Sequence, residues 1–194
     1  MIWDSNVWKM ELKRDITSLK RRLQQAAMPS GRGITDQVVA KIEKFAFTSA
    51  FITRKLMEAK KLSDELEGSV LPVQSFPRIN AGEQIDFMNW YHLDRFYDFA
   101  NPNAQQVSAR DLCNLLVHSM VFSVASEEDE RHVTGFLFNS DRSKDTALME
   151  IKLEIYFEFI EGVIRDDVVH MSYNRRTGAL IKSRRHTRTH ARAP

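Results

Sequence analysis

The sequence predicts an α+β fold in which an N-terminal helical hairpin and a third helix pack on a small, mainly antiparallel sheet. The first third of the chain repeats apolar residues at helical spacing, whereas residues 120–153 follow the two-residue alternation of strands. Apolar residues make up 43% of the 194, which suffices for one core without disulfides or a metal. We place a single domain at residues 1–182 and a basic, disordered tail at residues 183–194.

Two long helices are expected at the start of the chain. Apolar residues recur every three or four positions over residues 7–27, and Pro29 ends this helix. A second helix is expected from residue 35 or 36 to residue 66, where Gly68 stops it. The connecting loop of about seven residues suits an antiparallel helical hairpin.

The sequence predicts extended segments and strands in the middle of the chain. Pro72 and Pro77 indicate extended chain over residues 68–83, part of it as an edge strand. Residues 84–99 are rich in aromatic side chains, and the acids between them favour core packing over a platform on which bases stack. Three segments with strand composition then form a meander: residues 120–124, 133–138 and 147–153.

The end of the predicted domain contains a short helix and a hairpin. Residues 155–164 are apolar apart from two glutamates and favour a short, largely buried helix. Residues 168–173 and 179–182 have strand patterns on either side of a turn. Gly178 in that turn suits a left-handed backbone, so the two strands are expected to form a β-hairpin.

Charge is distributed unevenly along the chain. The net charge is +2, but seven cations and no acid lie after residue 174, which leaves 21 cations against 26 acids in the rest. Such an arm can contact phosphates, with counterion release as the driving force. We therefore hypothesise a non-enzymatic accessory or interaction protein that contacts RNA or DNA through these cations: Arg175, Arg176, Lys182, Arg184, Arg185, Arg188 and Arg192. A solubilising tail, or one that docks on a protein partner or on the acidic body of another copy, is the alternative explanation.

A polar stripe marks the third predicted helix. Ser108 is followed three residues later by Asp111, a capping-box pattern that opens a helix ending near residue 119. Arg110, Asn114 and His118 are four residues apart and lie along one face of it. These groups can bind a phosphate and transfer a proton, as metal-independent RNA cleavage requires. A solvated helix face explains the same pattern.

The alternative function is therefore a small metal-independent ribonuclease or toxin-like enzyme. Helical ribonucleases of the HEPN superfamily place an Arg and a His a few residues apart on one helix. Arg110 and His118 are too far apart to match that spacing, whereas Arg165 and His170 (RDDVVH) match it, although the second half of this stretch has a strand pattern. Our favoured hypothesis remains non-enzymatic.

Two further stretches carry a resemblance. Residues 46–66 (AFTSAFITRKLMEAKKLSDEL) and 111–122 (DLCNLLVHSMVF) resemble a group of uncharacterised bacterial proteins. The resemblance implies a bacterial, cytoplasmic origin and no particular activity.

Several classes of site and location are not expected. The sequence has no glycine-rich phosphate loop and no zinc signature, and the polar runs at 127–130 and 140–145 are expected to be solvated turns, so we predict neither a metal nor a cofactor. The single cysteine, Cys113, excludes an internal disulfide. Apolar runs are too short for a membrane helix, and the N-terminus lacks the apolar core of a secretory signal. We expect a soluble, cytoplasmic protein with no membrane partner.

Overall fold

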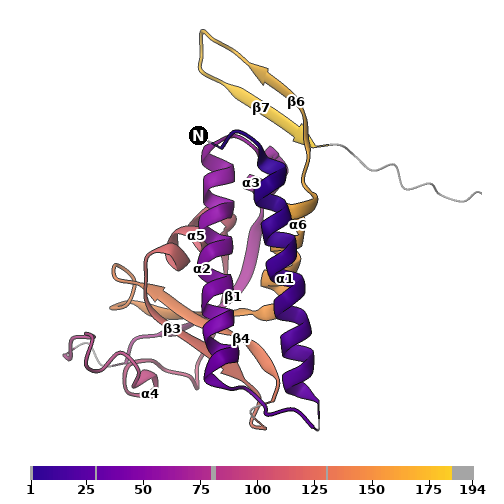
Figure 1. Cartoon of the computed structure of the whole chain (residues 1–194). Coiled ribbons are helices and arrows are strands. Elements are labelled where there is room, and N and C mark those ends of the chain that lie inside the picture. The colour runs from indigo at the N-terminus through magenta and orange to yellow at the C-terminus, as the bar shows by residue number, and fades with distance from the viewer. Residues whose placement is uncertain (1, 29, 80–81, 130, 185–194) are drawn as a thin grey trace, which may run out of the picture.

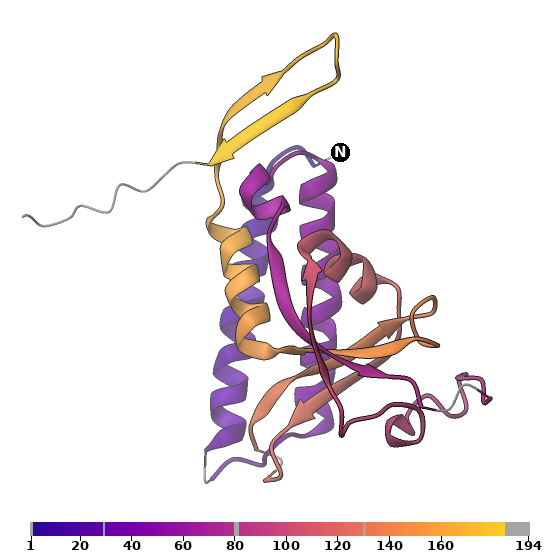
Figure 2. The same ribbon diagram turned by 180° about the vertical axis from the view of Figure 1, so that it is seen from behind.

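A computed structural model describes residues 2–28, 30–79, 82–129 and 131–184. It confirms the α+β fold class. A five-stranded antiparallel sheet, in the order β2-β1-β5-β4-β3, has the long helices on one side, and a separate two-stranded hairpin projects from one end (Figures 1 and 2). The elements in chain order are α1 (Ser5–Ala27), α2 (Asp36–Glu58), α3 (Asp64–Glu67), β1 (Val70–Pro77), α4 (Leu93–Phe96), β2 (Asn103–Ser108), α5 (Ala109–Val117), β3 (Ser119–Ser126), β4 (Val133–Ser140), β5 (Ala147–Lys152), α6 (Leu153–Arg165), β6 (Val168–Tyr173) and β7 (Leu180–Arg184).

The predicted helical hairpin is confirmed, but its second helix is shorter than expected. The side chain of Asp4 accepts a hydrogen bond from the amide of Asn6 at 2.8 Å and so caps α1. The helix α2 ends at Glu58 instead of residue 66, because Lys60 adopts a left-handed backbone with φ of 60°. Ser63 then caps the separate short helix α3.

The sheet corrects two expectations about its strands. β1 is not an edge strand, since β2 pairs along one side of it and β5 along part of the other. Pro72 is accommodated because β5 pairs only with residues 74–77, so that proline lies beyond the end of β5. β2 was not expected, because four of its six residues are exposed polar or small residues without an apolar alternation. The predicted β3-β4-β5 meander is confirmed.

The sheet is covered on both faces. The helices pack on one face and form the main core, whereas the segment around α4 covers part of the other face. Phe96 and Tyr97 are buried in this second cluster, as the core hypothesis for residues 84–99 requires. The hypothesis is wrong for Phe87 and Tyr91, whose side chains are largely exposed.

The centre of the main core is a contact between α2, α6 and β4. The ring of Tyr156 on α6 packs edge-on against Phe136 of β4, with 5.1 Å between the ring centroids. Its hydroxyl oxygen lies 2.7 Å from Ser49 Oγ on α2 and donates to the Ala46 carbonyl at 3.1 Å. A tyrosine can be fully buried here because α2 supplies the hydrogen-bond partners that its hydroxyl needs.

The predicted buried helix and terminal hairpin are also confirmed. The helix α6 spans Leu153–Arg165, and Gly178 has φ of 72° in the turn between β6 and β7. β7 reaches Arg184 and so includes the first two residues of the predicted tail, and residues 185–194 lie outside the described residues. None of the helices in the described part of the chain combines the length and the apolar content that crossing a bilayer requires.

We predict that Tyr156→Phe lowers the free energy of unfolding by about 1 kcal/mol, the typical net value of one buried hydrogen bond. Urea denaturation of the variant and the unchanged protein measures the difference. Tyr91→Phe is the matched control and should change nothing, because the Tyr91 side chain is mostly exposed. Equal effects of the two substitutions would contradict the role given to the Tyr156 hydroxyl.

Candidate functional site

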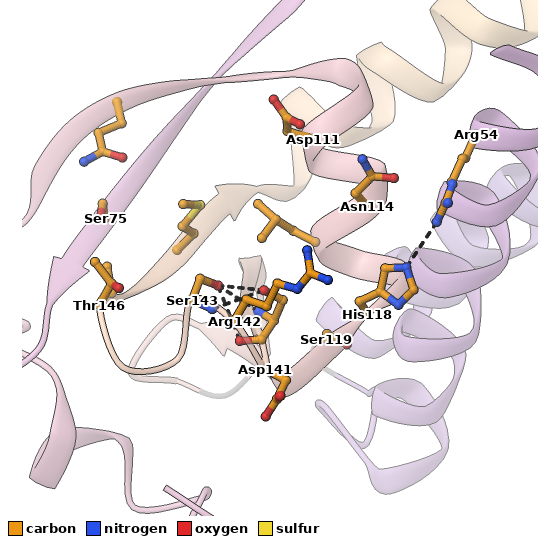
Figure 3. Close-up of a pocket in the computed structure, with 15 residues that line it drawn as sticks. Arg54, Ser75, Asp111, Asn114, His118, Ser119, Asp141, Arg142, Ser143 and Thr146 are labelled. Carbon is orange, nitrogen blue, oxygen red and sulfur yellow. Dashed lines mark hydrogen bonds between the residues drawn. The ribbon is translucent and has the colours of Figure 1, made fainter. Parts of the chain in front are cut away.

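A cleft of about 940 Å³ opens between α2, α5, the neighbouring strands and the turn that joins β4 to β5 (Figure 3). We call it the α5 cleft. Polar side chains from separate elements line it, including Arg54, Gln105, Asn114, His118, Arg142 and Thr146. It contains two of the three residues that the polar stripe of the third helix singled out.

The orientation of α5 follows from its cap and its buried face. Ser108 Oγ accepts the amide of Asp111 at 3.0 Å and donates to the Asp111 carboxylate at 2.6 Å, so the capping interaction that the sequence indicates is present. Leu112, Cys113 and Leu116 are buried on the core side of the helix. This arrangement leaves the opposite face of α5 for the cleft.

His118 and Arg54 meet at one wall of the cleft. His118 is the C-terminal cap of α5, and its Nε2 lies 3.2 Å from Nη1 of Arg54 on α2. A guanidinium only donates hydrogen bonds, so Nε2 is the acceptor in this contact. The same guanidinium also pairs with Glu58, with 3.0 Å between Arg54 Nε and the carboxylate.

Arg142 stands in the β4–β5 turn. Hydrogen bonds between Ser140 and Ser143 hold this turn, and Tyr97 donates to the Lys144 carbonyl at 2.8 Å. The side chain of Arg142 reaches toward the His118 side of the cleft (Figure 3). It is exposed and has no hydrogen bond or ion pair to any described residue.

The other polar side chains in the lining of the cleft are two acids that have partners within the protein and two amides that have none among the described residues. Of the two acids in the lining, Asp141 pairs with Lys144 at 2.6 Å, whereas the Asp111 carboxylate accepts a hydrogen bond from the Ser108 hydroxyl at 2.6 Å. The side-chain amides of Asn114 and Gln105 have no hydrogen bond to any part of the chain that the structure describes. The cleft therefore contains hydrogen-bond donors without partners among the described residues, whereas both of its acids already have partners.

Three of the predicted catalytic candidates are not part of this site. Arg110 lies outside the cleft and is 3.8 Å from a carboxylate oxygen of Glu67. Arg165 pairs with Glu161 on its own helix at 3.4 Å. His170 lies on β6 and lines a smaller cavity of about 220 Å³ at the base of the hairpin. No hydrogen bond joins Arg165 to His170 within the described residues.

Arg54, Gln105 and Arg142 were missed by the sequence analysis. They lie on a helix, an edge strand and a turn that are far apart in the chain, so no spacing rule connects them. Arg54 occupies the position that the sequence hypothesis gave to Arg110, as the guanidinium next to His118.

The hypothesis that all seven cations after residue 174 contact nucleic acid needs one correction. Lys182 is not available to a ligand, because its side chain is 2% exposed and its ammonium donates to the Leu62 carbonyl at 2.7 Å and to Glu67. Its backbone amide also donates to Asp64 at 2.8 Å. Arg175 and Arg176 are exposed in the hairpin turn. Arg184 is the last described residue, and the other three predicted cations lie outside the described residues: Arg185, Arg188 and Arg192.

One group of side chains has the composition of a metal site. The ligand atoms of Glu127, Asp129 and His132 lie within 4.8 Å of one another between β3 and β4. All three are exposed, and His132 Nδ1 is 3.1 Å from Asp129 and 3.5 Å from Glu127. These contacts are what a solvated turn with ion pairs contains, so the group carries no metal assignment.

Comparisons of the chain with protein-family models, with curated proteins and with solved structures gave no match. The resemblance of residues 46–66 and 111–122 to uncharacterised bacterial proteins stays a prediction. Function must therefore be argued from the site itself.

We predict that the thiol of Cys113 on α5 is unreactive in the folded protein. It is fully buried, and burial raises its pKa to about 12, so the reactive thiolate is almost absent at neutral pH. A chromogenic thiol reagent should react only when urea unfolds the chain, and the signal is unambiguous because the sequence has one cysteine.

The same burial predicts how pH changes stability. Above about pH 9 the unfolded chain loses this thiol proton while the folded chain keeps it, so the free energy of unfolding should fall as the pH rises. Rapid modification of the native protein at neutral pH would contradict the burial of Cys113.

Proposed function

We propose that the protein binds an anionic, phosphate-bearing ligand in the α5 cleft. The observation that carries this proposal is Arg142, a guanidinium in the cleft lining without a partner among the described residues. Guanidinium groups bind phosphate oxygens through two parallel hydrogen bonds, which makes arginine well suited to this ligand. Arg54 supplies a second guanidinium from the α2 wall.

The size and lining of the cleft favour a ligand larger than a free phosphate ion. A volume of about 940 Å³ lies in the range of small-molecule sites, and Leu115 and Met149 contribute apolar surface to the lining. The amides of Asn114 and Gln105 can donate to and accept from a polar, uncharged part of the ligand. A phosphate ester with a heterocycle or sugar, such as a nucleotide, has this combination of groups.

An enzymatic version of the proposal assigns proton transfer to His118. A phosphate that attracts the Arg54 guanidinium would release Nε2 of His118 to act as a base. This version replaces the predicted set of Arg110, Asn114 and His118 with Arg54, Asn114 and His118. It requires no metal.

We predict that Arg142→Ala weakens the binding of nucleoside monophosphates by about 10- to 100-fold, since a hydrogen bond to a charged group contributes roughly 1.5–3 kcal/mol. Isothermal titration with purine and pyrimidine monophosphates, and with inorganic phosphate, measures the affinity. Arg21→Ala is the matched control, because Arg21 is an exposed cation on α1 outside the cleft lining.

Two outcomes of this titration would count against the proposal, and an RNA cleavage assay tests its enzymatic version. Equal weakening by both substitutions would reduce the binding to non-specific charge attraction and contradict the proposal, as would the absence of binding at millimolar ligand. If the protein also cleaves RNA, His118→Ala should abolish cleavage while Arg21→Ala leaves it unchanged.

A second candidate function is contact with RNA or DNA through the terminal hairpin and the residues after it. It is favoured by Arg175 and Arg176, two exposed cations at the tip of a hairpin in which residues 168–184 include no acid. The burial of Lys182 removes one of the seven cations from this interface. The arm would contact phosphates and not bases, so its binding would be strong only at low salt.

We predict that the full chain binds single-stranded RNA with a log affinity that falls against log salt at a slope of roughly −3 to −4, for about four to six phosphates neutralised. Arg175→Ala with Arg176→Ala should reduce the magnitude of this slope by about 1 to 2, whereas Arg21→Ala with Arg22→Ala, on the exposed side of α1, should leave it unchanged. Fluorescence anisotropy over a salt series gives the slope. An unchanged slope in the hairpin variant would exclude the hairpin as the nucleic-acid contact.

A further inference from the structure

A small cavity lies at the base of the terminal hairpin, at the end of the molecule where α1 begins and α2 ends (Figures 1 and 2). Its volume of about 220 Å³ is below the range of sites for drug-sized ligands and suits a small ion. We call it the hairpin-base cavity. Its lining contains three lysines, Lys9, Lys60 and Lys61, and one carboxylate, Asp167. Cations therefore outnumber acids in this lining.

Lys60 occupies an unusual backbone position for a lysine. It directly follows the C-cap of α2 and, among the described residues, is the one non-glycine residue with a positive φ, at 60°. Its amide donates to the Met57 carbonyl at 3.0 Å, and the amide of Lys61 donates to the Leu56 carbonyl at 2.9 Å, which is the Schellman arrangement. Glycine is the usual residue at this position, because a side chain is strained on a left-handed backbone. A glycine would therefore end α2 more stably than Lys60 does.

The dipole of α2 explains positive charge in this region but not this particular lysine. Cations near a helix C-terminus are stabilised by its partial negative charge. Lys55 in the last turn and Lys61 already supply cations there. The helix itself does not require a further lysine at the one position where glycine is favoured. The side chains of Lys60 and Lys61 form no hydrogen bond or ion pair with a described residue, so both ammonium groups can contact a ligand.

Lys9 forms the buried side of the cavity. It is 7% exposed, and its ammonium donates to the Asp166 carbonyl. An ammonium carries three protons, and the other two have no hydrogen-bond acceptor among the described residues. Burial lowers the pKa of Lys9, while the nearby charges of Asp166 and Asp167 act in the opposite direction. A further anion beside Lys9 would favour its charged form.

Two other groups in the lining can contribute to anion binding. Ser5 is the first residue of the 23-residue helix α1, so it adds a hydroxyl donor at the positive end of the helix dipole. His170 contributes an imidazole from β6. Asp167 opposes an anion, but it is exposed, so water and salt screen its charge. The donors of the cavity thus come from α1, from the end of α2 and from the hairpin.

We propose that the hairpin-base cavity binds a small tetrahedral oxyanion, phosphate or sulfate, either free or as the terminal group of a phosphate monoester. Lys9, Lys60 and Lys61 would contact the anion as point charges, a way in which lysine commonly binds phosphate. The anion would connect α1 and the end of α2 with β6, where the hairpin leaves the body. This site is separate from the α5 cleft and does not rest on the function proposed for that cleft.

The variant Lys60→Gly separates anion binding from stability. Glycine removes the strain at the left-handed position, so the midpoint of urea denaturation should stay the same or rise. Loss of one ammonium should weaken the binding of inorganic phosphate by on the order of tenfold. Isothermal titration of the full chain at constant ionic strength measures this affinity. Lys41→Ala is the matched control, because Lys41 is an exposed lysine on α2 outside the lining, and it should change nothing.

All titrations are made with proteins that also carry Arg142→Ala, so that phosphate bound in the α5 cleft does not contribute. Absence of Lys60-dependent binding of phosphate and sulfate at about 10 mM, well above a dissociation constant of about 1 mM, overturns the proposal. Equal affinities of Lys60→Gly and Lys41→Ala also overturn it. Failure of this proposal leaves nucleotide binding by the unchanged α5 cleft as a separate result, and the reverse holds as well.

A titration with glycerol phosphate distinguishes the two sources of the anion. Tighter binding than that of inorganic phosphate, lost in Lys60→Gly, identifies a phosphate monoester as the ligand. Equal or weaker binding, with Lys60-dependent binding of inorganic phosphate, identifies the free anion.

Chemical labelling locates the anion in the unchanged protein. Sulfate should slow the acetylation of Lys60 and Lys61 several-fold relative to chloride at the same ionic strength, because their ammonium groups would contact the anion. The acetylation of Lys41 should not change. Mass spectrometry of the labelled peptides gives the rate at each lysine. Equal rates at Lys60 in sulfate and in chloride, measured up to saturating sulfate, contradict the proposed site.

Discussion

The contact of Tyr156 with Ser49 and Phe136 joins α6, α2 and the sheet at the centre of the main core. It joins α6 to α2 by a hydrogen bond and joins α6 to the sheet by ring packing. The position of α2 then fixes Arg54 near the end of α5, and the position of α6 fixes where the terminal hairpin begins. The cleft and the hairpin are therefore both positioned by helices that meet at Tyr156.

Arg142 is distinguished by its place in the lining of the α5 cleft. Exposed cations of α1 and α2 are in part paired within one turn, as Arg14 is with Glu11 and Lys55 with Glu58, and in part without a partner among the described residues, as Arg21 is. In the cleft, the β4–β5 turn orients Arg142 while its neighbour Asp141 is paired with Lys144. A guanidinium without a partner among the described residues can form hydrogen bonds to an external anion, which is the physical basis of the proposed function.

At the base of the terminal hairpin, in contrast to Arg142, the cations Lys9 and Lys182 are buried and have partners within the protein. Lys182 is buried with carboxylates and a carbonyl around it, and Lys9 is buried against the Asp166 carbonyl, where desolvation lowers its pKa. Buried charges of this kind specify one geometry, because any other arrangement leaves them without partners. They hold the base of a hairpin whose turn carries the exposed residues Arg175 and Arg176.

The sequence by itself determined the elements that repeat a short-range pattern: the helices at residues 7–27 and 155–164, the meander, the cap at Ser108 and the turn at Gly178. These depend on neighbours within a few residues, so local spacing is enough to find them. Only the tertiary structure decided that β2 joins the sheet, that Arg54 and not Arg110 stands beside His118, and that Lys182 is buried. Each of these depends on pairing between segments far apart in the chain, which no local pattern records.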